Sequence, residues 1–507
     1  MRDPGYEQVY AKYTDGVLFN SQIGLYDTVE NNENFFIGKQ WEGVEANGNP
    51  TPTFNFLKRV TLVQVATVAS DNFGIQATPM GMDRGLEPLT QVINTQFASL
   101  FERNKVVSLT REFLRNAAVD GDGCLYTYFD PDVETGQAMR GDLVTEIVEN
   151  TRVLFGNPYD KNVQSQPWLM ITLRKPLEEV RRMAEKNGFD PASIRSDQEQ
   201  GGSAMERLSQ GKVTLLVYFQ KDPETGHIWA GKYTQSGPVE KFRDTGLKLY
   251  PVTWMNWDYV QDCYHGHALI SQLIPNQVFV NQLFAMVMRS LQTTAFPKVI
   301  YDRTRIPRWD GGVGRAIGVN GGGDLSSIAK IMDPASVSPQ ISQFIDAAIN
   351  YTQNFMGSTD AALGDVRPEN TSAILALQRA SNAPLELVKQ NLYQAVEDLG
   401  RIYLDMMSVY YGTRWVQGAD GMGMELDFTL LRNLPLTLRL DVGASSYWSE
   451  IAAVQTLDNL LAQDKITLDE YLERIPDGYI SKKQELIEKC KIAGRKEQEH
   501  GQFEQYR

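Results

Sequence analysis

Apolar residues recur at helical spacing through the middle of the chain, between Gly266 and Tyr411. The first such stretch runs from about His267 to Thr294, and its apolar positions lie at helical rather than strand spacing. They are Val278, Leu283, Met286, Val287 and Leu291. At ~1.5 Å per residue, the predicted helix is roughly 40 Å long. Pro275 lies within it, so the helix either kinks at that residue or begins there.

A segment rich in glycine and proline follows, from residue 295 to residue 337. Its composition is typical of turns and short strands, so we predict a small α/β lobe. Ser338 can then cap a second helix that has Pro339 at its first position and ends near Met356. The stripe of this helix consists of Ile341, Phe344, Ile345, Ala348 and Thr352.

A loop and a very long helix complete the central region. The loop, residues 357–370, is net acidic and rich in small residues, and for an arbitrary protein it would simply be a connection. The helix spans residues 371–411, with Thr371 or Ser372 as its cap and a kink at Pro384. Its apolar stripe is most economically a core-facing seam, although a ring could also use it between subunits. The stripe consists of Leu385, Val388, Leu392, Val396, Leu399, Tyr403, Met406 and Tyr410.

Helices dominate the first 120 residues. Periodicity in residues 1–33 predicts a peripheral helix, and residues 54–73 predict a buried one. Residues 87–120 predict a single further helix. Its charged residues mark one face that is either solvated or in contact with another subunit. They are Glu102, Arg103, Lys105, Arg111, Glu112 and Arg115.

Two hairpins follow, because strand-like runs flank turns of the form Asp-Pro with Glu-Thr-Gly close behind. The first hairpin or meander joins residues 124–129 to 143–148, and the second joins residues 213–220 to 227–233. A short charged helix at residues 176–187 lies between them. After the long helix, residues 424–428 and 436–442 are predicted strands. A helix at 448–463, a capping box at Thr467 and a charged helix from Ser481 end the chain, so the fold class is α+β.

Composition limits the classes of function. The 507 residues are 42% hydrophobic and 22% charged, which is enough for two to four structural units. A net charge of -14 argues against tight binding of nucleic acid by phosphate neutralisation, although DNA could still slide past such a protein. Cys124, Cys263 and Cys490 are too few and too far apart for a disulfide framework, which indicates a reducing site of synthesis. With no 18-residue apolar run and no signal peptide, we expect a soluble cytoplasmic product and no membrane partner.

Candidate chemistry is sparse. The pair His265 and His267 has metal-like spacing but no third ligand, so an ordinary polar pair is the favoured interpretation. Asp120 and Asp122 lack the spacing of a calcium loop and are better explained as turn residues. The glycines of residues 312–318 do not form a nucleotide-binding signature, and a Ser-x-x-Lys spacing at residues 327–330 has no companion motifs. We therefore expect no catalytic residue, metal or cofactor, and a scaffold or conduit rather than an enzyme.

The predicted lobe at residues 295–337 is net positive in an acidic protein. Its charged residues are Lys298, Arg303, Arg305, Arg308, Arg315 and Lys330 against Asp302, Asp310, Asp324 and Asp333. One interpretation is a solvated surface of mixed charge. The other is a docking face, because arginine and tryptophan often anchor protein interfaces; this face would consist of Arg303, Arg305, Arg308 and Trp309.

Several short segments, taken in order, resemble the portal protein (head-tail connector) of tailed bacteriophages. They are Asn34–Trp41, Asn55–Val60, Ala117–Gly123, Leu273–Gln277 and Ala362–Gly364. The resemblance spans about residues 30–445. It implies a portal-type fold: an α/β wing, long stem helices, a clip, a tunnel loop and a helical crown. The implied bounds are wing 1–265, stem helices 266–294 and 338–356, clip 295–337, tunnel loop 357–370, long wing helix 371–411, wing strands 412–447 and crown 448–507.

The resemblance also implies a function. A portal subunit belongs to a dodecameric ring at one capsid vertex of the virion, assembled in the host cytoplasm with major capsid and scaffolding proteins. The terminase would dock at the clip and package double-stranded DNA through the ring, and tail or adaptor proteins would attach later. DNA would pass without sequence-specific contacts along tunnel-loop residues, namely Thr359, Asp360, Asp365, Arg367, Glu369 and Asn370. The alternatives are another head-tail connector ring and, less favoured, a nucleic-acid-processing enzyme.

Overall fold

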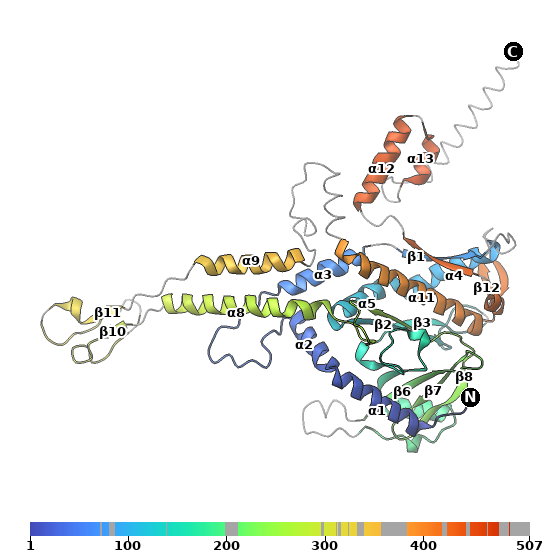
Figure 1. Cartoon of the computed structure of the whole chain (residues 1–507), viewed down its shortest axis with the longest axis horizontal. Helices are drawn as coiled ribbons and strands as arrows, with labels where there is room; N and C mark the ends of the chain where they lie inside the picture. The colour runs from blue at the N-terminus through green and yellow to red at the C-terminus, as the bar shows by residue number, and fades with distance from the viewer. Residues whose placement is uncertain are drawn as a thin grey trace, which may run out of the picture.

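The computed structural model shows a body of helices and antiparallel sheets from which two long helices project, ending in a small lobe (Figure 1). It describes the chain except for residues 71–72, 81–86, 138, 198–210, 296–298, 311, 313–315, 323, 332–338, 356–382, 418–422, 435, 443–446, 464, 476–485 and 487–507. The described residues mix helix and sheet, which agrees with the predicted α+β class.

Two antiparallel sheets lie in the body. The order of the three-stranded sheet is β3-β2-β9, and that of the five-stranded sheet is β4-β5-β6-β7-β8. Both predicted hairpins are confirmed, since β2 pairs with β3 and β6 pairs with β7. The strands are β2 Asp122–Asp130, β3 Asp142–Ile147, β4 Val153–Phe155, β5 Trp168–Pro176, β6 Lys212–Lys221, β7 Ile228–Tyr233, β8 Pro238–Asp244 and β9 Val252–Asn256.

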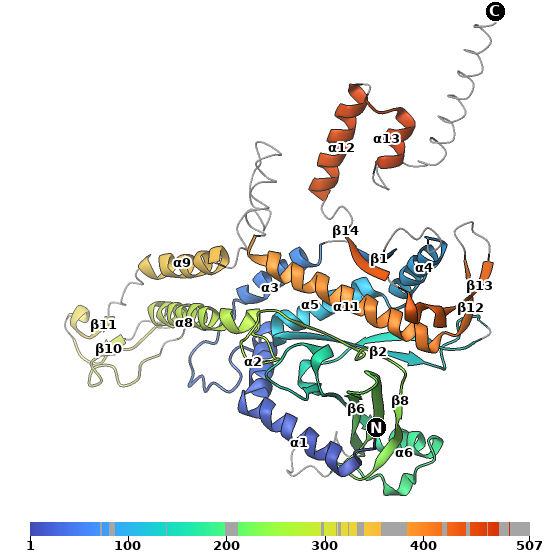
Figure 2. The same ribbon diagram turned by 45° about the vertical axis from the view of Figure 1, so that its right-hand side comes forward.

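Alternation along β6 explains how two helices cover the five-stranded sheet. Leu216 and Tyr218 pack with Val9 of helix α1 (Tyr6–Gln22), whereas Val213 and Leu215 pack with residues of α6 (Leu177–Lys186). Successive side chains of a strand point to opposite faces, so even and odd positions meet different helices. Figure 2 shows α1 running along the sheet near the N-terminus.

The remaining N-terminal helices differ from the prediction. They are α2 Leu25–Ile37, α3 Phe56–Val68, α4 Glu87–Arg103 and α5 Val106–Asp120. The single helix predicted for residues 1–33 is divided between α1 and α2 at Gly24, whose φ is 69°. The single helix predicted for residues 87–120 was wrong, because the chain breaks at Lys105, whose φ is 50°. The Asn104 side chain donates to Leu143 O at 3.0 Å and accepts from Thr145 N at 2.9 Å. Docking on β3 therefore replaces helix continuation at this point.

Helix α11 (Glu386–Tyr410) crosses the body and buries the predicted stripe, including Leu392, Val396, Leu399, Tyr403 and Met406. The core-facing interpretation of this stripe is confirmed. Pro384 lies in a 3₁₀ turn, Ala383–Leu385, directly before α11, and the part of the predicted helix before residue 383 lies outside the described residues.

The strands after α11 are β12 Thr413–Gln417, β13 Gly423–Asp427 and β14 Leu436–Val442. The predictions for β13 and β14 are confirmed. Strand β14 pairs antiparallel with β1 (Phe73–Pro79), so two segments that lie far apart in the sequence are neighbours in the fold. Strand β12 pairs with β13.

Helices α8 (Leu269–Ala295) and α9 (Pro339–Phe355) project side by side from the body in both ribbon views. We call them the helix pair. Pro275 lies inside α8, which settles the open question in favour of a helix that begins before it. At the end of the pair, β10 (Val299–Tyr301) and β11 (Ala329–Ile331) form a two-stranded sheet, which we call the tip lobe together with the described residues between them.

Helices α12 (Tyr447–Ala462) and α13 (Leu468–Arg474) lie above the body in Figure 1. The predicted capping box is confirmed, since Thr467 and Glu470 bond to each other's backbone N–H. The helix predicted from Ser481 falls outside the described residues, apart from Leu486. None of the described helices combines the length and the apolar character that crossing a membrane requires.

Candidate functional site

The base of α8 is fixed by a buried carboxylate, Asp122. One of its oxygens accepts hydrogen bonds from Asn256 Nδ2 at 2.7 Å and from Gly266 N at 2.6 Å. The other lies 2.6 Å from His265 Nδ1. A buried carboxylate of this kind is stable only when its oxygens are satisfied, as they are here. Asp122 therefore joins the end of α5 to the segment that leads into α8.

This arrangement supports the ordinary interpretation of both weak metal motifs. His265 is buried against Asp122, whereas His267 is exposed and lies 3.3 Å from the side chain of Gln272. The two histidines thus face different surroundings. Across the described residues, no group of three His, Cys, Asp or Glu side chains could hold a metal ion.

A second polar layer lies about two to three turns along α8. Gln277 accepts from Leu57 N at 3.2 Å and donates to Phe54 O at 2.7 Å. Asn281 donates to the side chain of Gln40 at 2.6 Å. Both α8 side chains are buried, so they tie the segment before α3 to the helix. We call Asp122, His265, Gln277 and Asn281 with their partners the root.

The sequence analysis did not identify the root as a site. The available signal was the interruption of an apolar helix by polar residues, among them Asn281, and the clustering of portal-like segments. The structure brings four of those segments together, because Gln40, Asn55 to Leu57, Asp122 and Gln277 all lie in or beside the root. Polar residues on the apolar face of a helix often mark such contacts, since burial requires partners.

Asp120 is a second buried carboxyl group beside the root, and it has fewer hydrogen-bond partners than Asp122. Burial raises the pKa of its carboxyl to about 7, with Glu33 adding to the effect and Arg115 opposing it. Within the described part of the chain, Asp120 Oδ1 is buried and has no hydrogen-bond partner. Arg115 is instead paired with Glu33. A carboxyl in such surroundings favours the neutral form.

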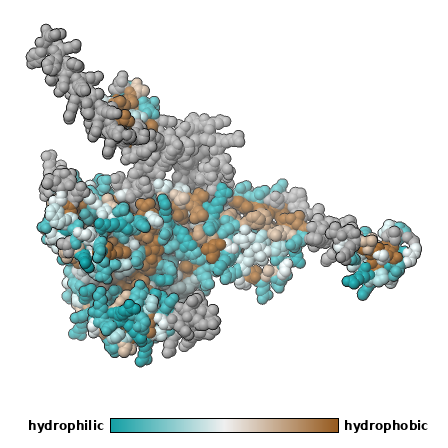
Figure 3. All heavy atoms as spheres, turned by 180° about the vertical axis from the view of Figure 1, so that it is seen from behind, coloured by the Kyte–Doolittle hydropathy of each residue, from teal (hydrophilic) through white to brown (hydrophobic). Residues whose placement is uncertain are grey.

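The flank of the helix pair has the opposite character. Exposed fractions are 48% for Phe279, 58% for Met286, 61% for Phe344 and 64% for Tyr351. We call these four residues the apolar flank. Figure 3 shows hydrophobic surface gathered along the helix pair on the face seen from behind. Large apolar patches of this kind mark interaction surfaces.

The helix pair also carries almost no charge. Arg289 is the one charged residue in the sequence of α8, and Asp346 is the one in the sequence of α9. The stripe predicted for these helices is therefore divided between two environments. Ile345 and Thr352 of the stripe are buried within the chain, whereas Met286, Leu291 and Phe344 are exposed.

The predicted docking residues lie in one turn of the tip lobe. Ile306 and Ile328 form its small buried centre, and Trp309 lies against Tyr301 with ring centroids 5.3 Å apart. Arg303 and Arg308 are exposed, and Arg305 is half-buried. Hydrogen bonds from the Thr304 side chain and backbone lower the pKa of Asp302 within this turn. Two of the three predicted arginines thus face solvent beside an aromatic pair.

The predicted tunnel-loop residues, Thr359, Asp360, Asp365, Arg367, Glu369 and Asn370, lie outside the described residues. So do Lys298, Arg315 and Asp333 of the predicted charged lobe.

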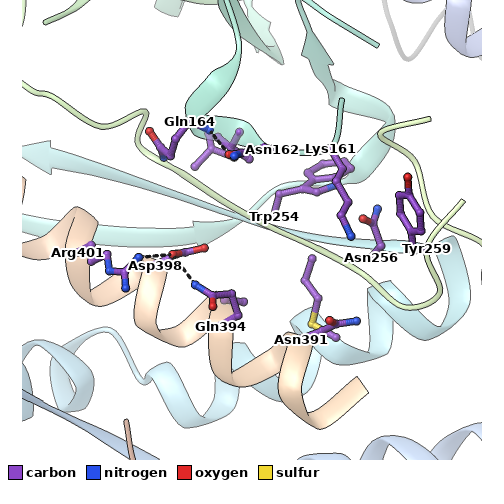
Figure 4. Close-up of a pocket in the computed structure, with 14 residues that line it drawn as sticks. Lys161, Asn162, Gln164, Trp254, Asn256, Tyr259, Asn391, Gln394, Asp398 and Arg401 are labelled. Carbon is purple, nitrogen blue, oxygen red and sulfur yellow. Dashed lines mark hydrogen bonds and ion pairs between the residues drawn. The ribbon is translucent and has the colours of Figure 1, made fainter. Parts of the chain in front are cut away.

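A cleft of about 490 Å³ lies between α11, strand β9 and the segment around Asn162. Figure 4 shows Asn391, Gln394, Asp398 and Arg401 of α11 along one wall, with Lys161, Trp254 and Tyr259 across from them. Its lining includes several carboxamides but only one carboxylate, that of Asp398.

The bonding inside this cleft does not suit acid–base catalysis. Asp398 accepts from Gln394 at 3.1 Å and pairs with Arg401 at 3.5 Å, and burial raises the pKa of its carboxyl. Lys161 Nζ lies 4.1 Å from the ring centre of Tyr259. Paired acid and base groups or an activated nucleophile are what a catalytic cleft needs. The lining of this cleft supplies neither arrangement.

Residues 222–422 match the model of the Phage P22-like portal protein family. The matched range contains the helix pair, the tip lobe and α11. No match was found among curated proteins. The resemblance stated from short sequence segments is therefore confirmed by a family-level comparison.

Proposed function

From the match of residues 222–422 to the Phage P22-like portal protein family, we propose that this chain is a portal protein whose copies form a ring-shaped channel at one capsid vertex. Double-stranded DNA would be packaged through this channel by the terminase and later ejected. The observation that carries the proposal is the helix pair itself. It projects from the body with an apolar flank that a single chain leaves in water.

The charge distribution favours copies that meet head to tail. A chain of net charge -14 repels its own copies over most of its surface, whereas the helix pair is close to neutral. Contact between α8 of one copy and α9 of the next brings Arg289 and Asp346 onto facing helices. Contact between two α9 helices would instead bring two Asp346 carboxylates together. A heterologous contact whose rotation closes produces a ring, and we propose a dodecamer.

The tip lobe suits a protein partner. Exposed Arg303 and Arg308 lie beside the Tyr301–Trp309 pair, and arginine with aromatic residues is enriched at protein interfaces. We assign this surface to the terminase during packaging and to tail or adaptor proteins afterwards. Replacing both arginines with glutamate should abolish terminase pull-down by intact rings. Unchanged pull-down would remove this surface from the proposal.

We propose that residues 357–370 contact the DNA backbone inside the channel. Thr359, Asp360, Asp365, Arg367, Glu369 and Asn370 supply few cations, and lasting contact with DNA requires cations that neutralise phosphates. Backbone contacts of this kind position DNA without reading bases. The acidic balance of the chain would then let DNA slide.

Two measurements test the proposal. Negative-stain electron microscopy with mass photometry of the purified chain should show closed rings of about a dozen copies around a central hole. A chain that stays monomeric even with added scaffolding protein and salt would contradict the portal assignment. Shortening residues 357–370 should leave rings intact and reduce DNA packaging, and full packaging by that variant would exclude this segment from the mechanism.

A further inference from the structure

A small polar cavity of about 60 Å³ lies in the body. The elements α4 and β12, which contribute to its lining, lie at the side of the body opposite the helix pair in Figure 1. The cavity is enclosed by the end of α4, the connection between β2 and β3, and the junction of α11 with β12. Its lining residues are Gln96, Ser99, Leu100, Arg103, Thr135, Gln137, Asp142, Tyr411, Arg414, Trp415 and Val416.

Two groups of hydrogen-bond acceptors in this wall, the Asp142 carboxylate and the Gln137 carboxamide oxygen, are already occupied. Asp142 Oδ1 accepts from the Tyr411 hydroxyl and from Leu143 N, and its Oδ2 accepts from Arg103 Nη1. The Gln137 carboxamide bonds to the backbone of Trp415 through both of its polar atoms, donating to its carbonyl at 2.9 Å and accepting from its N–H at 3.0 Å. A ligand that needs acceptors from the protein would find few here.

The donors, in contrast, are only partly used. Arg414 is 6% exposed and donates through Nε to Tyr411 O and through Nη2 to Gly141 O, whereas its Nη1 has no partner among the described residues. Arg103 uses Nη1 on Asp142 and no other guanidinium nitrogen in the same part of the chain. Burial also lowers the pKa of Arg414, whose guanidinium lies over the Tyr411 ring at 3.6 Å from the ring centre. Two guanidinium groups face one carboxylate, so the cavity is net positive.

Size and chemistry together select the ligand. One water needs about 10–15 Å³ of cavity volume. The cavity of about 60 Å³ therefore has room for about four waters or one tetrahedral ion. The planar fork of arginine matches the oxygens of phosphate and sulfate, and partly buried guanidinium groups bind them strongly. We propose that the cavity binds a small tetrahedral oxyanion, inorganic phosphate or sulfate, held by Arg103 and Arg414 with the Ser99 hydroxyl.

Such an ion would link three segments that lie far apart in the sequence. Arg103 belongs to α4, Arg414 follows α11, and the residues from Thr135 to Gln137 belong to the β2–β3 connection. The bound anion would therefore stabilise the packing of α4 and the β12 strand against the three-stranded sheet. This inference concerns the body and does not depend on ring formation or on DNA.

The test uses the full chain and compares phosphate, sulfate and chloride at matched ionic strength. We expect a saturable rise in Tm of about 2–4 °C with phosphate or sulfate, and direct binding of phosphate by calorimetry. Ser99→Leu should fill the cavity and abolish both effects. Ala98→Leu, on an exposed position of the same helix, should retain them. Arg103→Lys should weaken phosphate binding about tenfold or more, because lysine lacks the fork.

Other outcomes would overturn the inference. An equal response to all three anions would show general salt effects. A phosphate response that survives in Ser99→Leu would place the ion elsewhere on the protein.

Discussion

At the base of α8, polar side chains are buried. Farther along the helix pair, several apolar side chains are exposed. Gln277 and Asn281 are buried and bonded to partners from the first 60 residues. Phe279 and Met286, on the same helix, are about half exposed. Buried polar groups give a contact direction and register, whereas exposed apolar groups gain free energy only when another surface covers them. The root therefore belongs to the folding of one chain, and the flank is the surface that we propose lies between chains.

The largest expected effect comes from breaking the root at Asp122. Asp122→Ala leaves the donors of Asn256, His265 and Gly266 without their acceptor in a buried site. We expect a loss of about 3–5 kcal/mol of unfolding free energy, as for other buried charged groups that lose a partner. Thermal unfolding and hydrogen exchange at the end of α5 and in β9 would measure it.

A matched control is Asp258→Ala, which removes an exposed carboxylate from the same region. Its effect should stay within about 0.5 kcal/mol. If the two variants were equally stable, the root would not be the element that fixes α8 to the body.

A smaller effect of opposite sign is expected at Asp120. Burial raises the pKa of this carboxyl to about 7, from about 3.9 in the unfolded chain. Between these values the folded chain holds a proton that the unfolded chain releases, so stability falls as pH rises from about 4 to about 7 and stays low above it. Full conversion of that pKa difference gives about 4 kcal/mol, and we expect about half because the residue is not fully buried.

Asp120→Asn should therefore stabilise the chain by about 2 kcal/mol at pH 8 and leave it almost unchanged at pH 4. Thermal unfolding across this pH range measures the effect. Asp27→Asn, at an exposed carboxylate of α2, should follow the wild-type curve. A wild-type pH dependence that persists in Asp120→Asn would show that another group carries it.

Local patterns in the sequence predicted much of the fold. Helices α8 and α9, the hairpins β2–β3 and β6–β7, and the capping box at Thr467 depend on residues close together in the chain. Their periodicity and turn residues are visible without any tertiary contact. The residues predicted for docking lie together in the tip lobe for the same reason, since they follow one another closely in the chain; their docking role stays a prediction.

Contacts between distant segments could not be predicted in this way. The break at Lys105 depends on Asn104 binding the backbone of β3, and β1 pairs with β14, which lies more than 350 residues later in the sequence. Gln277 could be recognised as polar on an apolar helix, but its partners near Leu57 could not. Tertiary partners decide these features, and single-sequence patterns do not encode them directly.

The smallest effect on the stability of one chain should come from the apolar flank. In contrast to the root, a substitution there should change assembly much more than folding. Phe344→Ser removes a side chain that is 61% exposed, so unfolding free energy should change by about 0.5 kcal/mol or less. Ring assembly should nevertheless weaken about tenfold or more, because aromatic anchors often carry much of an interface's binding energy. Mass photometry over a dilution series measures this weakening of assembly.

Leu18→Ser, on α1, removes an apolar side chain of similar exposure outside the helix pair and should leave rings intact. Rings that persist in Phe344→Ser would show that Phe344 is not an anchor of the interface; equal losses in both variants would show that exposed apolar area anywhere, and not the flank, drives association.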